Sequence, residues 1–155
     1  MSNDIKEMIR GYYDVYFNIG AIYEEFAKMH GLTSSSLFVL YIVHQQPEQC
    51  TQATIVEQLF YPKQTVSSIL NSFDKLGYIT KNISVQDRRI RHISLTEAGQ
   101  QFAGQVIADM LELEETAFIR MKDAERKGML QGEQAFLKQL TWSMETLQAA
   151  KHASD

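Results

Sequence analysis

The sequence predicts a mainly α-helical fold with one small β-hairpin, and three observations support this fold class. Apolar side chains recur at three- and four-residue spacing along most of the 155 residues, which is typical of amphipathic helices. A two-residue alternation between residues 79 and 95, on both sides of a polar turn, predicts two paired strands. Gly31, Pro47, Pro62 and Gly77 interrupt the helical spacing, so the middle of the chain should hold short helices joined by tight turns.

The composition limits the possible classes of protein. A chain of 155 residues with 45% hydrophobic residues is expected to form one domain with a buried core. The longest wholly apolar run, Leu37–Val43, is far shorter than the roughly 20 residues of a membrane span. The polar N-terminus lacks the apolar core of a signal peptide, and a single cysteine excludes an internal disulfide framework. We therefore expect a cytoplasmic protein.

Three helices are predicted in the first 60 residues. Residues 4–29 should form a long helix because apolar residues recur there almost as heptads, and Gly31 should end it. Thr33 and Thr51 are each expected to cap a shorter helix, because a threonine side chain can accept a hydrogen bond from a free N–H of the first turn. The inward-facing residues expected in the two shorter helices are Leu37, Leu40, Tyr41, Ile55, Val56 and Leu59.

The fourth predicted helix has two contrasting faces. Pro62 should open this helix and Gly77 should follow its end. The face predicted to be buried carries Val66, Ile69, Leu70, Phe73 and Leu76. The opposite face holds neither a large apolar group nor a carboxylate, and it consists of Gln64, Thr65, Ser67, Ser68, Asn71 and Lys75.

The predicted hairpin follows directly. Its strands should share a buried face that carries Ile79, Ile83, Ile93 and Leu95. Thr96 is then expected to cap a long helix, which residues 122–132 should interrupt before a last helix begins. The inward-facing residues expected in the first of these helices are Phe102, Val106, Met110 and Leu113. The last helix carries the apolar residues Phe136, Leu140, Met144 and Leu147.

Positive charge is concentrated in one part of this acidic chain. Residues 60–92 contain six Lys and Arg against two Asp, a net charge of +4. Because the whole chain carries −4, the remainder carries −8. A basic region in an acidic protein indicates a local contact with a polyanion, and an ordinary solvated surface is the alternative.

Two short helices followed by a hairpin make a winged helix-turn-helix, in which the second helix can enter the major groove of DNA. That groove is about 12 Å wide, and a helix face that enters it should be polar and free of carboxylates, which phosphates repel. The polar face of the fourth helix meets these requirements, although a solvated face would look similar. At the hairpin tip, Arg88 and Arg89 could reach the adjacent minor groove, with Asp87 paired to one of them.

The hairpin and the start of the next helix read DRRIRHISLTEAG, residues 87–99. This stretch resembles the D-x-R-x-x-x-[VI]-x-L-T-x-x-G pattern of the MarR-type regulators (multiple-antibiotic-resistance regulators), a winged helix-turn-helix family. Upstream, the segments LTSSSLFVL, CTQATIVEQL and QTVSSILNSFDKLGYI resemble the second, third and recognition helices of that family, in the same order. The resemblance is specific over residues 32–99, and beyond them only long amphipathic helices correspond.

The resemblance implies a single domain over residues 1–155, with a winged helix-turn-helix at 32–96 and dimerisation helices at 1–31 and 97–155. It also implies a homodimeric, sequence-specific DNA-binding transcription regulator, a repressor on a pseudo-palindromic operator. Residues 122–134 depart from the family by forming a longer link between the last two helices. The DNA contacts that the resemblance implies by position are those of Ser34, Ser35, Thr51, Gln52, Lys63, Gln64, Thr65, Ser67, Ser68, Asn71, Arg88 and Arg89.

Aromatic residues on the first two helices suggest an effector site. Members of the family bind small aromatic effectors between the dimerisation helices and the winged unit. A ligand held there would favour a spacing of the two winged units that no longer fits the operator. Packing in the core or in the dimer interface is the alternative. The residues that could line such a pocket are Tyr12, Tyr13, Tyr16, Phe17, Phe38 and Tyr41.

The remaining signals indicate no catalysis, metal or cofactor. Cys50 lies outside the first helix, where redox-sensing relatives carry their reactive thiol, and the four histidines lack metal-ligand spacing. No phosphate-binding loop or nucleophile motif is present in the sequence. A winged-helix module that binds proteins and no DNA is the main alternative, since the total charge is acidic. A small enzyme with an aromatic-lined pocket is a third, although it lacks a paired nucleophile and base.

Overall fold

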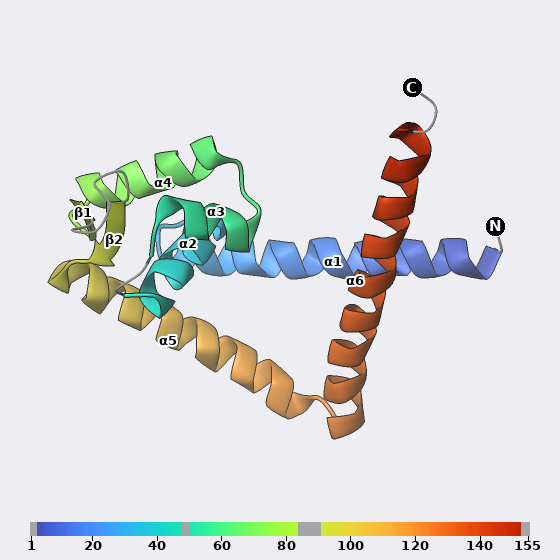
Figure 1. Cartoon of the computed structure of the whole chain (residues 1–155). Coiled ribbons are helices and arrows are strands. Elements are labelled where there is room, and N and C mark those ends of the chain that lie inside the picture. Colours follow the sequence, from blue (N-terminus) through green and yellow to red (C-terminus); the bar gives the residue numbers. More distant parts are fainter. Residues whose placement is uncertain (1–2, 48–49, 84–90, 153–155) are drawn as a thin grey trace. The chain divides into compact units, whose positions relative to one another are not determined.

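The computed structural model describes residues 3–47, 50–83 and 91–152 and contains six helices and one hairpin in that part of the chain (Figure 1). Chain contacts divide it into two compact units, residues 1–110 and 111–155. The prediction of a mainly helical fold with one hairpin is confirmed. The elements are α1 (Asn3–Met29), α2 (Ser34–Gln45), α3 (Gln52–Leu59), α4 (Lys63–Lys75), β1 (Ile79–Ile83), β2 (Arg91–Leu95), α5 (Glu97–Arg120) and α6 (Asp123–His152).

Local capping fixes where the short helices begin. The side chain of Thr33 accepts a hydrogen bond from the N–H of Ser36 at the start of α2. Thr51 and Thr54 form a capping box at α3, in which each side chain accepts from the backbone N–H of the other residue. The side chain of Thr96 caps α5 by accepting from the N–H of Gly99. All three predicted threonine caps are therefore confirmed.

The core of the first unit forms where α2, α3 and α4 pack against one another, the end of α1, the hairpin and the first half of α5. Two predicted core residues are exposed instead. Leu76 is 59% exposed because it lies at the C-cap of α4, past the last buried turn. Ile83 is 60% exposed because it pairs with Arg91 at the end of the hairpin next to the connection between the strands, beyond the cover of the helices.

The hairpin is antiparallel, with a register that runs from Ile79 opposite Leu95 to Ile83 opposite Arg91. Ile79 and Ile93 are buried, as predicted, and they hold the base of the hairpin on the helices. The N–H of Ile93 also donates to the carbonyl of Cys50 at 2.8 Å, just before α3. The hairpin is thereby joined to the start of α3 by backbone as well as by side-chain packing.

Gly99 makes a close approach that only glycine permits. A Cβ atom at this position would lie 1.9 Å from the carbonyl oxygen of Tyr78, which accepts a hydrogen bond from the N–H of Thr96. Because the atoms that a Cβ would meet are backbone atoms of Tyr78, they cannot move without shifting β1 or the start of α5. The glycine in the predicted family pattern thus serves the packing of α5 on the hairpin.

We expect Gly99→Ala to lower the free energy of unfolding by roughly 2–3 kcal/mol, the upper part of the usual range for overpacking. Gly104→Ala on the same helix is the matched control, because a Cβ there meets nothing within 4 Å. Alanine is a better helix former than glycine by about 1 kcal/mol, so the control should be as stable as the parent or more so. Urea unfolding followed by circular dichroism measures both; equal effects would contradict the close approach.

The second unit corrects one prediction. Residues 122–132 were expected to interrupt the helices, but α6 begins at Asp123 and includes most of that segment. Glu125 stabilises its first turn, because the carboxylate accepts from the N–H of Lys122 at 2.8 Å. Asp123 and Lys127 add an ion pair at 2.7 Å, four residues apart. Gly128 and Gly132 are accommodated inside the helix.

The apolar faces of the long helices are largely uncovered in the single chain. No residue of α6 is buried in the single chain, and the first half of α1 is exposed as well. Leu113, which was expected to face inward, is also exposed, so that prediction is wrong for one copy of the chain. Within the described residues, no single helix has the length and apolar character to cross a membrane. Only α1 and α2 taken together reach that threshold, with a 76° bend between them. The exposed large apolar residues of α6 are Met129, Leu130, Phe136, Leu137, Leu140, Trp142, Met144 and Leu147.

Candidate nucleic-acid interface

The polar face of α4 points outward. Val66, Leu70 and Phe73 are buried on the opposite side of the helix and anchor it in the core. Because an α-helix advances about 100° per residue, burying these three positions turns the intervening polar positions to solvent. The residues of this outward face are Gln64, Ser68 and Asn71, which are exposed, and Thr65 and Ser67, which are partly exposed.

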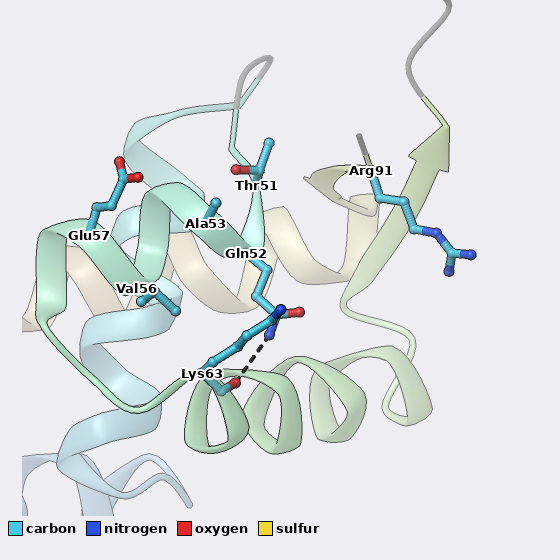
Figure 2. Close-up of a pocket in the computed structure, with 7 residues that line it drawn as sticks. All are labelled: Thr51, Gln52, Ala53, Val56, Glu57, Lys63 and Arg91. Carbon is cyan, nitrogen blue, oxygen red and sulfur yellow. Dashed lines mark hydrogen bonds between the residues drawn. The ribbon is translucent and has the colours of Figure 1, made fainter. Parts of the chain in front are cut away.

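Two cationic residues line a cavity beside the start of α4 (Figure 2). The cavity has a volume of about 560 Å³, and its lining includes Lys63 from α4 and Arg91 from β2. Gln52, on α3, also lines it, and its side-chain amide donates to the carbonyl of Lys63 at 3.1 Å. This bond joins the first turns of α3 and α4. The other lining residues are Thr51, Ala53, Val56 and Glu57.

Lys81 on β1 joins the hairpin to the outward face of α4. Its ammonium group donates to Oδ1 of Asn71 at 2.9 Å and lies 3.2 Å from a carboxylate oxygen of Asp74. Both carboxylate and ammonium are partly solvated, so the pair adds little to stability. Its effect is geometric: it keeps β1 close to α4 and occupies one acceptor of Asn71.

The helix N-termini predicted to hold phosphates already have internal partners. The N–H of Thr51 donates to Thr54, and the N–H of Ser34 donates to a carboxylate oxygen of Glu24 at 2.9 Å. Ser34 and Ser35 line a groove of about 610 Å³ together with residues of the outward face of α4. Arg88 and Arg89, the predicted wing contacts, lie outside the described residues.

The aromatic residues predicted to line an effector pocket fall into two groups. Tyr12, Tyr13, Tyr16 and Phe17 are exposed along the first part of α1, where the centroids of neighbouring rings lie 5.6–6.0 Å apart. Tyr12 stacks on Tyr16 and Tyr13 on Phe17, and the other two pairs are tilted or edge-on. Phe38 instead packs on Tyr23 at 5.3 Å, and Tyr41 packs partly buried against the core. Tyr23 lies six residues beyond Phe17, roughly 9 Å along the helix axis.

The environment of Cys50 makes its thiol unreactive. The side chain is fully buried, and burial raises the pKa of the thiol to about 11, although a hydrogen bond with Thr54 opposes this shift. The thiolate is the reactive form of cysteine, and at neutral pH almost none is present at such a pKa. Among the described residues, no group of three His, Cys, Asp or Glu side chains is arranged to hold a metal ion.

Three residues of this surface were not among the predicted site residues. Arg91 could have been found from its place at the edge of the hairpin, next to the two predicted arginines. Glu24 and Lys81 act through contacts with residues ten positions away, and no local pattern in the sequence indicates such contacts. The candidate interface therefore includes two charged residues, Glu24 and Lys81, whose contacts are visible only in the folded structure.

Comparisons with known proteins agree with this geometry. A profile described as MarR family matches residues 30–90. The transcriptional regulator PapX of Escherichia coli is 32% identical over 79 residues, which cover 50% of this chain and 48% of PapX. The chain thus spans about half the length of that curated relative.

Solved structures with the same fold include regulators bound to DNA or to a ligand. The Staphylococcus aureus MepR–DNA complex has a TM-score of 0.72 at 21% identity and covers 83% of this chain and 97% of MepR. CouR from Rhodococcus jostii RHA1, bound to p-coumaroyl-CoA, has a TM-score of 0.70 at 18% identity, covering 86% and 92%. At these identities the likeness establishes the fold.

Proposed function

We propose that this chain, a winged helix protein similar to the MarR family over residues 30–90, is a transcription regulator that binds double-stranded DNA in a sequence-specific manner. The observation that carries the proposal is the outward polar face formed by Gln64, Thr65, Ser67, Ser68 and Asn71 on α4. Asp74, the carboxylate that borders this face on the same helix, is paired with Lys81. The relatives that match are named as transcriptional regulators and not as enzymes.

In the proposed complex, α4 enters the major groove. Gln64 can form two hydrogen bonds with an adenine edge, and Ser68 can donate to or accept from any base. Lys63 and Arg91 lie at one end of this face and are placed to contact the phosphates that flank the groove. Arg88 and Arg89 are proposed to reach the neighbouring minor groove from the tip of the hairpin.

We propose that two copies bind together. The apolar side chains of α6 and of the first part of α1 form faces that stay exposed among the described residues of a single chain, and a second copy would remove them from water. In this arrangement residues 32–96 read the DNA, and residues 1–31 and 97–155 hold the dimer. A two-fold dimer reads a pseudo-palindromic operator, with half-sites one helical turn apart or a multiple of it.

Regulation by a small aromatic ligand is part of the proposal. Such a ligand would relieve repression by favouring a dimer geometry that does not fit the operator. Stacked tyrosine and phenylalanine rings are available on α1, and the fold is shared with CouR, whose structure contains p-coumaroyl-CoA.

Selection from a pool of random duplexes tests the proposed function. The purified protein is mixed with the pool at low salt, and the bound duplexes are amplified and sequenced over several rounds. A pseudo-palindromic sequence with half-sites about 10 bp apart should be enriched. Absence of any duplex affinity at low salt would instead favour the protein-interaction module.

Gln64→Ala should weaken binding to the selected duplex by about 1–3 kcal/mol, because alanine cannot form the two hydrogen bonds to one base. The preference should relax at one or two base positions only, which a panel of single-base operator variants measures by fluorescence anisotropy. Gln58→Ala is the matched control, since Gln58 is an exposed glutamine on the neighbouring helix α3. A uniform decrease in affinity across all duplexes would mean that Gln64 touches the DNA backbone and not a base.

A further inference from the structure

Glu24 on α1 forms the connection between that helix and the start of α2. One carboxylate oxygen accepts the N–H of Ser34 at 2.9 Å, and the other lies 3.6 Å from the ammonium group of Lys28. The hydrogen bonds with Ser34, foremost that from its N–H, lower the pKa of Glu24, and Lys28 acts in the same direction. The carboxylate is therefore charged at neutral pH, and its partial exposure to solvent favours the same form.

The same carboxylate lines the groove between α2 and α4. Its neighbours in the groove are Thr33, Ser34 and Ser35 from the α2 side, and Gln64, Thr65, Ser68 and Ile69 from α4. Every one of these neighbours is uncharged, so among the described lining residues Glu24 alone contributes a formal charge. The groove borders the face of α4 that is proposed to enter DNA.

A negative charge in this place opposes the binding of a polyanion. The N-terminus of a helix carries a partial positive charge that attracts phosphate, and the carboxylate of Glu24 offsets it at α2. Phosphates brought alongside α4 would also be repelled by the carboxylate directly, within the range over which charges interact at physiological salt. Lys28, whose ammonium group lies 3.6 Å from the carboxylate and is well exposed to solvent, offsets part of this charge.

We propose that Glu24 limits the affinity of this protein for DNA by a repulsion that does not depend on base sequence. The inference rests on the proposed function and adds a residue that lowers the affinity for DNA. The repulsion weakens binding to every duplex by the same factor. Stable occupancy of a site then depends on the base contacts of α4, and backbone contacts alone hold the protein less well on unrelated DNA.

Glu24→Gln tests the inference because it removes the charge and keeps an oxygen that can accept from Ser34. Glu25→Gln is the matched control: it makes the same charge change at the next position of α1, on an exposed side chain outside the groove. Binding is measured by fluorescence anisotropy on two labelled duplexes, one selected by the parent protein and one of unrelated sequence, at 50 and 200 mM salt.

At 50 mM salt we expect Glu24→Gln to bind both duplexes roughly 3–10-fold more tightly, with a smaller increase at 200 mM because the charge is screened. Glu25→Gln should change affinity by less than about 2-fold, as expected for a charge whose interactions are screened by solvent. For each variant, the ratio of the dissociation constants for the two duplexes should stay unchanged.

Thermal unfolding should be unaltered in both variants. Glu24→Ala, which also removes the hydrogen bond to Ser34, should unfold at lower temperature but still bind more tightly than the parent when folded.

The other outcomes distinguish a failure of the inference about Glu24 from a failure of the proposed function. Equal effects of Glu24→Gln and Glu25→Gln would overturn the inference, because total charge would explain both. Weaker binding by Glu24→Gln and Glu24→Ala would also overturn it and would make Glu24 a positioning residue for α2. If the parent and every variant lack duplex affinity, the proposed function itself fails. If the parent binds and Glu24→Gln binds equally well, only the inference about Glu24 fails.

Discussion

Affinity for duplex DNA should fall by about 10³ to 10⁵-fold between 50 and 200 mM salt, the decrease expected when roughly six to ten phosphates are neutralised. In a dimer, each copy would contribute Lys63 and Arg91 beside α4 and the two arginines at the hairpin tip. Each neutralised phosphate releases counterions from the DNA, so the logarithm of the affinity falls linearly with the logarithm of the salt concentration. Anisotropy titrations at four or more salt concentrations measure this slope.

Replacing Arg88 and Arg89 together by alanine should make the slope shallower, by about one for each phosphate that the variant no longer neutralises. The double variant should remain a dimer, because residues 88 and 89 lie outside the two proposed dimerisation segments, residues 1–31 and 97–155. Lys138→Ala with Lys151→Ala is the control, since it removes the same charge from exposed positions of α6. If the control flattens the slope equally, total charge and not the wing governs binding.

Phe136→Glu combined with Leu140→Glu should convert the dimer into monomers. Both side chains are about half exposed in the single chain and lie four residues apart on one face of α6. In the proposed dimer they would be buried, and two unpaired carboxylates cannot be buried there without a large cost. Without the second half-site, operator binding should weaken by roughly 10² to 10⁴-fold, the range typical of an interaction that is no longer bivalent.

Sedimentation equilibrium, together with anisotropy on the selected duplex, measures both effects. Gln131→Glu with Gln134→Glu is the control, because it places two new carboxylates on the opposite side of α6 and should leave the dimer intact. A parent protein that is monomeric at micromolar concentration would contradict the proposed dimer. A dimeric Phe136→Glu, Leu140→Glu variant would place the interface on another face.

The parts of the fold that depend on neighbouring residues could be predicted from the sequence. The caps at Thr33 and Thr51 involve partners three residues away, so the threonines and the apolar spacing that follows them locate the helix starts. The orientation of α4 could also be predicted, because Val66, Leu70 and Phe73 all fall on one side of a helix. The burial of Ile79 and Ile93 followed from the alternation of apolar and polar residues along the two strands.

Other features depend on contacts that the local sequence does not indicate. Residues 122–132 contain two glycines and many charges, which suggested a loop, but the Glu125 cap and the Asp123–Lys127 pair support a helix there. Burial of the long helices could not be judged, because an amphipathic pattern does not say whether the same chain or another copy covers the apolar face. The bond between Glu24 and Ser34 arises only once α1 and α2 are folded against each other.

The backbone bond between Ile93 and Cys50 has a mechanical consequence. With the Thr51–His92 bridge beside it and Lys81 bound to Asn71, the base of the wing cannot swing independently of the helices that flank it. The helices α3 and α4 and the paired strands must therefore move as one rigid reading head. A change in the distance between two such heads has to be absorbed outside this segment.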